Sequence, residues 1–247
     1  MKVSPVFVRL IEALADPKYR VYILQGGVGS TKTTSALQAF YIIANRLKDK
    51  SLFSIVSESF PHLSRGAIRD FCGPNVMGAD YSDDVYNKTE HTLPVYNSLI
   101  EFFAIDHPDK GLGPRRDWLY INEAPRLRWE EANNLMIRTR KKTIIDFNPI
   151  HKFWAHDLIG QPGVWFDKST YKDNPFLSLD EVRDIESRRK NKNWWRVFGE
   201  GEVGNIEGLI IPEFEVIDRM PNIPTDIGLD FGFTNDPTAC IEGGIKG

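Results

Sequence analysis

Apolar positions along the chain form two kinds of block, which predict strands and helices in alternation. Short apolar runs with no polar face are typical of strands buried on both sides. They occur at Arg20–Leu24, Ser51–Ser57, Trp118–Ile121 and Lys142–Phe147. Apolar residues at helical spacing separate these runs, at residues 1–20, 31–47, 61–71 and 129–139. This alternation predicts an α/β fold, with a largely parallel sheet between layers of helices.

The chain departs from this alternation in two places. Residues Tyr86–Phe103 alternate between apolar and polar positions, which predicts a pair of strands with one exposed face. After Tyr171 the sequence becomes polar and helical, and a new strand is predicted at Ile227–Phe233. We therefore expect a core at 1–171, a small helical subdomain and linker at 172–222, and the first strand of a further domain at 223–247.

Composition narrows the class of protein. The 247 residues carry 31 Lys and Arg against 34 Asp and Glu, a formal net charge of −3, so any contact with a nucleic acid needs a local basic patch. Cys72 and Cys240 have no neighbouring cysteine or histidine, which argues against a disulfide framework or a zinc site and fits a reducing cytoplasm. No apolar run reaches the ~20 residues of a membrane span, and the N-terminus lacks a signal-peptide pattern, so we expect no membrane contact.

A glycine-rich segment between the first strand and the next helix carries the first chemical motif. Gly26–Thr33 reads GGVGSTKT and differs at one position from the phosphate-binding loop G-x-x-x-x-G-K-[ST]. In such a loop the main-chain N–H groups surround phosphates, a lysine reaches the β and γ phosphates, and a hydroxyl binds Mg²⁺. Lys32 and Thr33 fit the last two roles. The residues that we expect at the nucleotide are Gly26, Gly27, Val28, Gly29, Ser30, Thr31, Lys32, Thr33 and Thr34.

One residue of this segment breaks the pattern. Thr31 replaces the second glycine, so this position either avoids a positive φ or accepts a strained one. The alternative interpretation of the segment is a glycine-rich turn that is followed by a coincidental Lys-Thr pair.

Polar residues at two strand ends complete the candidate site. Asn122 and Glu123 follow one predicted strand and Asn148 follows the next. Ligands of an open α/β sheet bind at the carboxyl ends of its strands, so these residues are expected beside the loop. Asn122 could hold a Mg²⁺-bound water without adding charge, Glu123 is the candidate base for an attacking water, and Asn148 could sense the γ-phosphate. The alternatives are a helix N-terminus for Glu123 and an Asn-Pro turn for Asn148.

Five segments make a resemblance to a known family specific. They are GGVGSTKT (26–33), LYINEA (119–124), DFNP (146–149), TYKDNPFL (170–177) and IGLDFGFTNDPTA (227–239). In this order they resemble the large subunit of tailed-bacteriophage terminases over nearly the whole chain. The resemblance implies a P-loop ATPase of the additional-strand, catalytic-glutamate class, with ATP and Mg²⁺ at Lys32 and Thr33. It also implies that Glu123 activates water and that Asn148 belongs to the coupling motif.

The resemblance also implies partners and a setting. The motor would move double-stranded DNA into a procapsid through its portal, with a terminase small subunit, in the cytoplasm of the phage's host. It would act as a homo-oligomeric ring, with the isolated chain as a monomer. Asn122 in place of an aspartate is typical of one branch of the family. Two other classes stay open: a nucleotide-binding structural or regulatory subunit without turnover, suggested by Thr31 and Asn122, and a helicase-like DNA motor.

An arginine is missing from the loop where many members of the family have one. Val28 occupies that position. The resemblance implies that the charge then comes from a neighbouring subunit, on the segment before the strand Trp118–Ile121, where Arg115 and Arg116 lie. The alternative for this pair is a solvated basic surface.

Two further contacts are predicted from residue type alone. Tyr19 and Arg20, just before the first strand, are candidates to stack on adenine, and the alternative is that they are ordinary residues of a strand edge. Residues 183–196 hold six basic and two acidic residues beside Trp194 and Trp195, which fits a helix face that follows DNA phosphates. Here the alternative, a solvated helix whose tryptophans pack on the core, is the favoured one.

The last predicted strand would begin an RNase H-like nuclease. By resemblance, Asp230 is its first metal-binding carboxylate. Two-metal cleavage needs several acids around the ions, and we expect the remaining ones to follow Gly247 in a longer chain. We therefore expect no DNA cleavage by this chain and a strand without a partner in it.

Overall fold

The computed structural model of the chain describes residues 1–105, 114–205, 219, 222–230 and 239–244. The chain forms two compact units, Met1–Ile206 and Glu207–Gly247. The helical segment after Tyr171 belongs to the first unit, together with the sheet. The division between the two compact units falls within the predicted subdomain and linker, 172–222.

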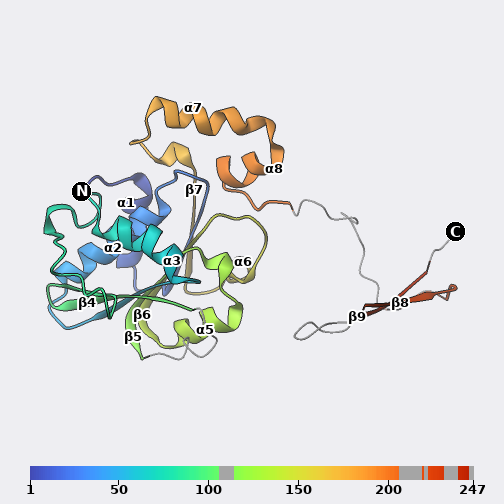
Figure 1. Cartoon of the computed structure of the whole chain (residues 1–247), viewed down its shortest axis with the longest axis horizontal. Helices are drawn as coiled ribbons and strands as arrows, with labels where there is room; N and C mark the ends of the chain where they lie inside the picture. Colours follow the sequence, from blue (N-terminus) through green and yellow to red (C-terminus); the bar gives the residue numbers. More distant parts are fainter. Residues whose placement is uncertain (106–113, 206–218, 220–221, 231–238, 245–247) are drawn as a thin grey trace. The chain divides into compact units, whose positions relative to one another are not determined.

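Within the described residues, seven strands form one sheet in the order β3-β4-β2-β5-β6-β1-β7 (Figure 1). All neighbours are parallel except β3 and β4, which form an antiparallel hairpin at one edge. The strands are β1 (Val21–Gly26), β2 (Leu52–Ser57), β3 (Thr92–Val95), β4 (Ser98–Ala104), β5 (Arg116–Ile121), β6 (Thr139–Phe147) and β7 (Val164–Ser169). The predicted parallel sheet and the predicted strand pair are both present.

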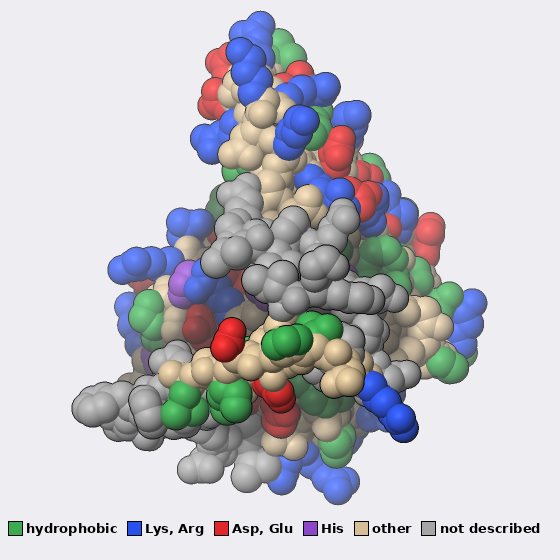
Figure 2. Space-filling view, turned by 90° about the vertical axis from the view of Figure 1, so that its right-hand side faces the viewer, with side chains coloured by type: hydrophobic (Ala, Val, Ile, Leu, Met, Phe, Trp, Pro, Cys, Tyr) green, Lys and Arg blue, Asp and Glu red, His purple; other side chains and the backbone are tan. Residues whose placement is uncertain are grey.

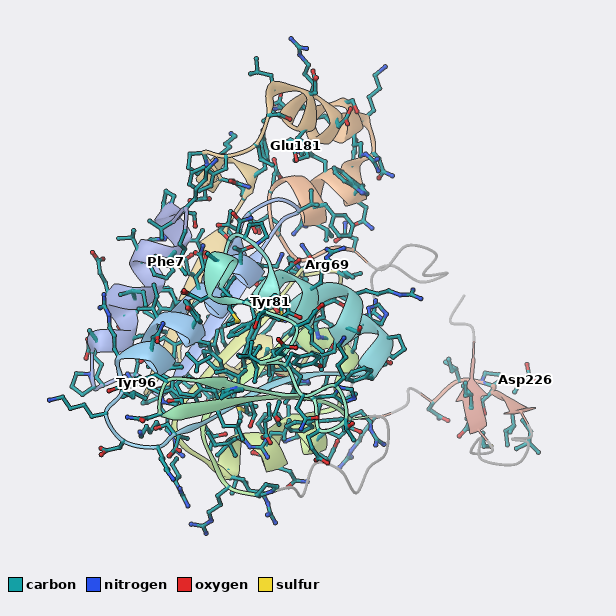
Figure 3. The ribbon with its side chains drawn as sticks, turned by 60° about the vertical axis from the view of Figure 1, so that its left-hand side comes forward. Phe7, Arg69, Tyr81, Tyr96, Glu181 and Asp226 are labelled. Atoms are coloured by element: carbon teal, nitrogen blue, oxygen red, sulfur yellow. The ribbon has the colours of Figure 1, made fainter. Side chains whose placement is uncertain are left out.

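Helices cover both faces of the sheet, and each face has its own hydrophobic core. One face is covered by α1 (Pro5–Ala15), α2 (Lys32–Arg46), α3 (Phe60–Leu63) and α4 (Arg69–Cys72), and the other by α5 (Trp129–Ile137) and α6 (Trp154–Leu158). Phe40 of α2 packs against Phe53, Trp118 and Tyr120 of the strands. Figure 3 shows side chains filling the space between the helices and the sheet, with Phe7 labelled on α1. Burial of both faces explains the continuous apolar runs in the strands.

Neighbouring residues of β6 point to opposite faces of the sheet. Ile144 is buried in the core on the α2 side, whereas Ile145 and Phe147 are buried in the core on the α5 side. Alternation along a strand therefore places Asp146 on the α2 side, at the carboxyl end of the sheet.

The segment after Tyr171 forms short helices at the top of Figure 1. They are α7 (Leu179–Ser187), α8 (Lys192–Trp194) and a π-helical turn at Trp195–Gly199. At the start of α7, the Ser178 hydroxyl accepts a hydrogen bond from the Glu181 N–H, and the Glu181 carboxylate accepts one from the Ser178 N–H. This reciprocal cap satisfies the first N–H groups of a polar helix.

The second unit contains a strand pair. β8 (Asp226–Asp230) runs antiparallel to β9 (Ala239–Gly243), with Asp230 opposite Ala239. The expectation that the last predicted strand lacks a partner in this chain was therefore wrong. Residues 231–233 of that predicted strand lie outside the described residues.

Candidate functional site

The glycine-rich segment joins the carboxyl end of β1 to the start of α2, as the motif requires. Gly29 has φ 68° and Thr31 has φ 67°, both in the left-handed region. Thr31 thus adopts the strained alternative that the sequence left open. Its hydroxyl donates a hydrogen bond to Ser4 Oγ at 2.7 Å, and Ser4 in turn caps α1. The first N–H groups of α2 have no partner within the helix and point toward the loop, which suits phosphate oxygens.

Gly27 has no room for a side chain, because another segment of the chain lies against it. A Cβ atom at Gly27 would lie 2.3 Å from the Phe198 carbonyl oxygen. The same carbonyl accepts a hydrogen bond from the Val28 N–H at 2.9 Å. The Asn174 side chain donates to the Gly29 carbonyl at 2.8 Å. The segment around α7 and α8 is therefore bonded directly to the loop.

Lys32 begins α2 and lies beneath the loop. Its side chain is buried, and Nζ donates a hydrogen bond to the Gly27 carbonyl at 3.2 Å. Burial lowers the pKa of the Lys32 ammonium, and the nearby carboxylates of Asp146 and Glu123 oppose this shift. A lysine side chain held against the loop by the Gly27 carbonyl is in the place where a phosphate-binding loop needs its cation.

A carboxylate that the sequence analysis did not single out lies at the centre of the site. The Thr33 hydroxyl donates to Asp146 Oδ2, and Asp146 Oδ1 accepts from Asn122 Nδ2 at 3.1 Å and from the Glu123 N–H at 3.0 Å. Asp146 is only 1% exposed. The available signal was an acid inside the apolar run IIDF, because a buried carboxylate needs partners. The structure thus brings Thr33, Asn122 and Glu123 together around Asp146.

Glu123 follows β5 with a left-handed backbone conformation, φ 57°. Its half-exposed carboxylate pairs with Arg126 Nε at 3.1 Å and lies 3.8 Å from His62 Nδ1. A cavity of about 170 Å³ beside it is also lined by Pro125, Arg126, Asn148 and Ile150. The carboxylate is therefore accessible at the edge of the site.

Asn148 lies at the end of β6, beside the loop. Its Nδ2 donates to the Gly26 carbonyl at 2.6 Å, and the Pro149 carbonyl accepts a hydrogen bond from the Gly204 N–H at 2.8 Å. The exit of β6 is thus bonded both to the phosphate-binding loop and to the segment that follows α8.

Tyr19 and Arg20 lie at the other end of β1 from the loop. Arg20 donates to the Thr139 carbonyl, and the Tyr19 ring lies under Lys18 Nζ at 4.6 Å. The structure does not bring these two residues to the loop. A strand of six residues separates them from it, so the predicted stacking on adenine loses its basis.

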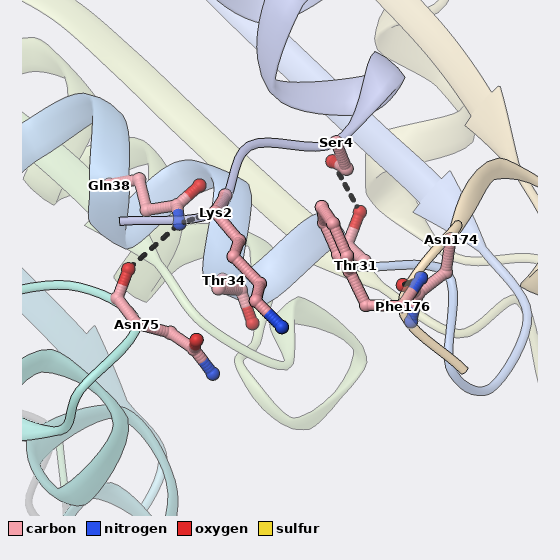
Figure 4. Close-up of a pocket in the computed structure, with 8 residues that line it drawn as sticks. All are labelled: Lys2, Ser4, Thr31, Thr34, Gln38, Asn75, Asn174 and Phe176. Carbon is pink, nitrogen blue, oxygen red and sulfur yellow. Dashed lines mark hydrogen bonds between the residues drawn. The ribbon is translucent and has the colours of Figure 1, made fainter. Parts of the chain in front are cut away.

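A polar pocket lies on the loop side instead. It has a volume of about 280 Å³, and Figure 4 shows the residues around it. They are Lys2, Ser4, Thr31, Thr34, Gln38, Asn75, Asn174 and Phe176. Gln38 Nε2 donates to the carbonyls of Lys2 and Asn75, which joins the N-terminal segment and residue 75 to α2. The glycine-rich motif and the residue that follows it mark only Thr31 and Thr34 of this pocket, because the other residues come from segments outside the motif.

The two candidate arginines before β5 have different surroundings. Arg115 is exposed. Arg116 is fully buried, stacks over the Phe103 ring at 5.1 Å and donates to the Pro114 carbonyl. Burial lowers the pKa of the Arg116 guanidinium. A buried side chain cannot reach a neighbouring subunit, so within this pair only Arg115 fits the predicted role.

The basic segment after α7 is not a uniformly basic face. Figure 2 shows Lys and Arg side chains mixed with Asp and Glu at the top of the view. Arg189 pairs with Glu186 and stacks on Trp195, and Arg188 stacks on Trp194. Both tryptophans are half-buried. These contacts favour the alternative in which the tryptophans are packed within the fold.

The predicted nuclease residue lies apart from the first unit's site in sequence. Asp230 ends β8, and its side chain is not among those that the structure describes.

Among the described residues, no group of three or more His, Cys, Asp or Glu side chains could hold a metal ion. Among the described helices, none has the length and apolar character that crossing a membrane requires.

The arrangement of strands defines the class of fold. One strand, β6, lies between β1, which leads into the phosphate-binding loop, and β5, which ends in Asn122 and Glu123. This is the fold of P-loop nucleoside triphosphatases of the additional-strand, catalytic-glutamate class. Within this class, the chain has the fold of phage large terminases, as comparison with solved structures shows.

The similar structures share little sequence with this chain. The large terminase of a thermophilic bacteriophage has a TM-score of 0.69 and 15% identity over 100% of this chain. The large terminase ATPase domain of Thermus phage P74-26 has a TM-score of 0.57 and 14% identity over 81% of this chain and 94% of its own. The chain spans 66% of the length of the first of these proteins, which has also been solved with ADP and with ATP-γ-S. No family model and no curated protein matches the chain.

Proposed function

We propose that this chain contains the ATPase motor of a phage terminase large subunit, which hydrolyses ATP with Mg²⁺ to move double-stranded DNA into a procapsid. The observation that carries the proposal is the convergence of Lys32, Thr33, Glu123 and Asn148 at one sheet edge, on three strand ends around a phosphate-binding loop. The shared fold with phage large terminases supports it.

The residues of the site have distinct roles in this proposal. Lys32 and the main-chain N–H groups of the loop bind the β and γ phosphates. Glu123 accepts a proton from the attacking water, and Asn148, bonded to Gly26, reports the state of the γ-phosphate to the chain after Pro149. Thr33 with the polar groups at the ends of β5 and β6 would hold Mg²⁺, because oxygen donors suit this ion. When bound, the ion supplies charge neutralisation at the phosphate oxygens.

The pocket in Figure 4 is the place that we propose for the nucleoside. Thr31 and Thr34 of the phosphate-binding segment line it, so a nucleotide whose phosphates lie in the loop can extend into it. Phe176 provides an aromatic ring, and Gln38, whose Nε2 donates to two carbonyls, provides its Oε1 as an acceptor for an adenine amino group. This placement replaces Tyr19 and Arg20.

The wider function follows from the same proposal. The partners are double-stranded DNA, the portal of the procapsid and a terminase small subunit, and the active form is a homo-oligomeric ring in the host cytoplasm. The isolated chain is a monomer with low turnover, because an arginine from a neighbour completes the site. We expect no DNA cleavage with Mg²⁺ or Mn²⁺, which conversion of supercoiled to linear plasmid would test.

Nucleotide binding and turnover by two variants test the central assignment. Lys32→Ala should abolish ATP binding, because it removes the cation that faces the phosphates. Glu123→Gln should keep binding and lower turnover by about 10²- to 10⁴-fold, the usual contribution of a general base. Glu130→Gln, an exposed change on α5, is the matched control and should alter neither.

The outcomes separate the competing functions. Turnover that rises with duplex DNA and procapsids supports the packaging motor. Binding without turnover under all conditions supports a regulatory subunit, and strand displacement supports a helicase-like motor. Equal turnover by the wild type and Glu123→Gln would refute the role of Glu123.

A further inference from the structure

Asp146 lies beside Thr33, the loop residue whose hydroxyl would bind magnesium in a P-loop triphosphatase. In this class the ion is held by the loop Ser or Thr and by an aspartate at the end of a neighbouring strand. Here the residue that follows β5 is Asn122, which is neutral. The carboxylate is on β6, where Asp146 accepts the hydrogen bond of the Thr33 hydroxyl.

The register of the sheet explains how a residue of β6 replaces one of β5. Tyr120 lies opposite Ile144 and Ile121 opposite Ile145 in the parallel pair. The next residues along the two strands are Asn122 and Asp146, which are joined by a hydrogen bond at 3.1 Å. Relative to the usual arrangement, the carboxylate lies on β6 and the amide follows β5. The negative charge therefore still lies beside Thr33.

The charge of Asp146 is not neutralised by the groups bonded to it. Its donors are a hydroxyl, an amide and a main-chain N–H, which are all neutral. A buried carboxylate is costly unless a cation is near. The neighbouring cation Lys32 directs its Nζ to the Gly27 carbonyl. A divalent cation beside Thr33 would neutralise the negative charge of the Asp146 carboxylate.

We propose that Asp146, rather than Asn122, supplies the negative charge of the magnesium site. Because Asp146 accepts the hydrogen bond that the Thr33 hydroxyl donates, the lone pairs of that oxygen stay available to the ion. By accepting the Glu123 N–H, Asp146 also holds the left-handed turn that presents the Glu123 carboxylate. Asn122 orients Asp146. This inference rests on the proposed nucleotide-binding function.

The magnesium dependence of nucleotide binding tests this assignment without any measurement of turnover. The affinity for ATP-γ-S is measured by calorimetry with Mg²⁺ and with EDTA, for the wild type and for Asp146→Asn. An asparagine has nearly the same shape, and the Thr33 hydroxyl can rotate to accept from its amide. We expect Asp146→Asn to lose about 10- to 100-fold of the Mg²⁺-dependent gain in affinity, while binding in EDTA stays within a few-fold of the wild type.

Two further variants make the test specific. In Asn122→Asp/Asp146→Asn the carboxylate moves back to β5, and we expect the magnesium dependence to recover. Asp117→Asn, which changes a carboxylate at the other end of β5, should leave the magnesium dependence unchanged. Thermal unfolding without nucleotide shows whether each variant is folded.

The results distinguish failure of this inference from failure of the proposed function. A wild type that binds ATP-γ-S more tightly with Mg²⁺, with the same gain retained in Asp146→Asn, would overturn the role of Asp146 and leave nucleotide binding in place. A wild type that does not bind nucleotide would overturn both. If the magnesium dependence does not recover in the folded double variant Asn122→Asp/Asp146→Asn, a carboxylate at residue 122 cannot replace one at residue 146. This result would refute the idea that the two positions have exchanged their roles.

Discussion

Thr31 shows how a residue that breaks the phosphate-loop pattern is accommodated. A left-handed conformation costs a residue other than glycine about 1–2 kcal/mol. Thr31 adopts it with φ 67°, and its hydroxyl bonds to Ser4 Oγ, the cap of α1. The side chain therefore contributes a contact between the loop and the first helix that a glycine could not make.

Two substitutions at Thr31 separate the backbone strain from the hydroxyl contact. Both Thr31→Ala and Thr31→Gly remove the hydrogen bond to Ser4, but only glycine relieves the positive φ. We expect Thr31→Gly to be more stable than Thr31→Ala by about 0.5–1 kcal/mol in urea unfolding. At Thr34, within α2, the order should reverse, because glycine is about 1 kcal/mol worse than alanine in a helix. The same order at both positions would contradict the strain at Thr31.

Among the site residues, those that belong to a sequence motif could be predicted and those defined by contacts could not. Lys32, Thr33 and Glu123 were predicted because their residue types and spacing follow from phosphate chemistry. Asp146 was not predicted, because its role depends on which strand lies next to β5. The order of strands in a sheet cannot be predicted from the local sequence. The burial of Arg116 was missed because two adjacent arginines give no sign that one of them points inward.

At the scale of elements, the buried strands and the β3–β4 hairpin were predictable, and the edge strand β7 was not. β1, β2, β5 and β6 are apolar on both faces, which leaves a clear pattern. β7 lies at the sheet edge and is mostly half-exposed, so its sequence VWFDKS has no such pattern. The predicted helix at 61–71 is interrupted by a π-helical turn at Ser64–Ile68, which depends on packing rather than on local propensity.

The pocket between α2 and the segment before α7 gives an element-scale prediction. If the adenine stacks on Phe176, Phe176→Ala should weaken ATP binding by about tenfold, a usual effect of losing a ring that stacks on a base. Binding of inorganic tripolyphosphate should not change, because it has no base. Leu179→Ala removes another exposed apolar side chain from the same region, outside the pocket, and is the control. Equal losses for ATP and tripolyphosphate would show that Phe176 acts on the loop instead.

At the scale of the whole molecule, the two arginines before β5 predict different consequences. Arg115→Ala should leave stability unchanged and lower the turnover of an assembled motor by about 10³-fold or more, as loss of an arginine that acts in trans does. Arg116→Ala should lower the free energy of unfolding by about 2 kcal/mol or more, because it empties a buried site. Urea unfolding and ATP turnover distinguish these effects.

Mixed assemblies test whether Arg115 acts on a neighbour. Subunits with Arg115→Ala and subunits with Lys32→Ala are each expected to be inactive alone. In a mixed ring some interfaces join an intact loop to an intact arginine, so partial turnover should return. Absence of rescue in assemblies shown to contain both subunits would rule out action in trans by Arg115.

The bonds between the phosphate-binding loop and the chain around Gly204 have a mechanical consequence. Val28 is tied to Phe198, and the exit of β6 at Pro149 is tied to Gly204. Under the proposed function, a change of the phosphates at the loop would therefore also act on these two bonds. If this chain is the proposed motor, tension applied at Gly204 would act through the same bonds in the reverse direction, so a load would bear on the proposed ATP site.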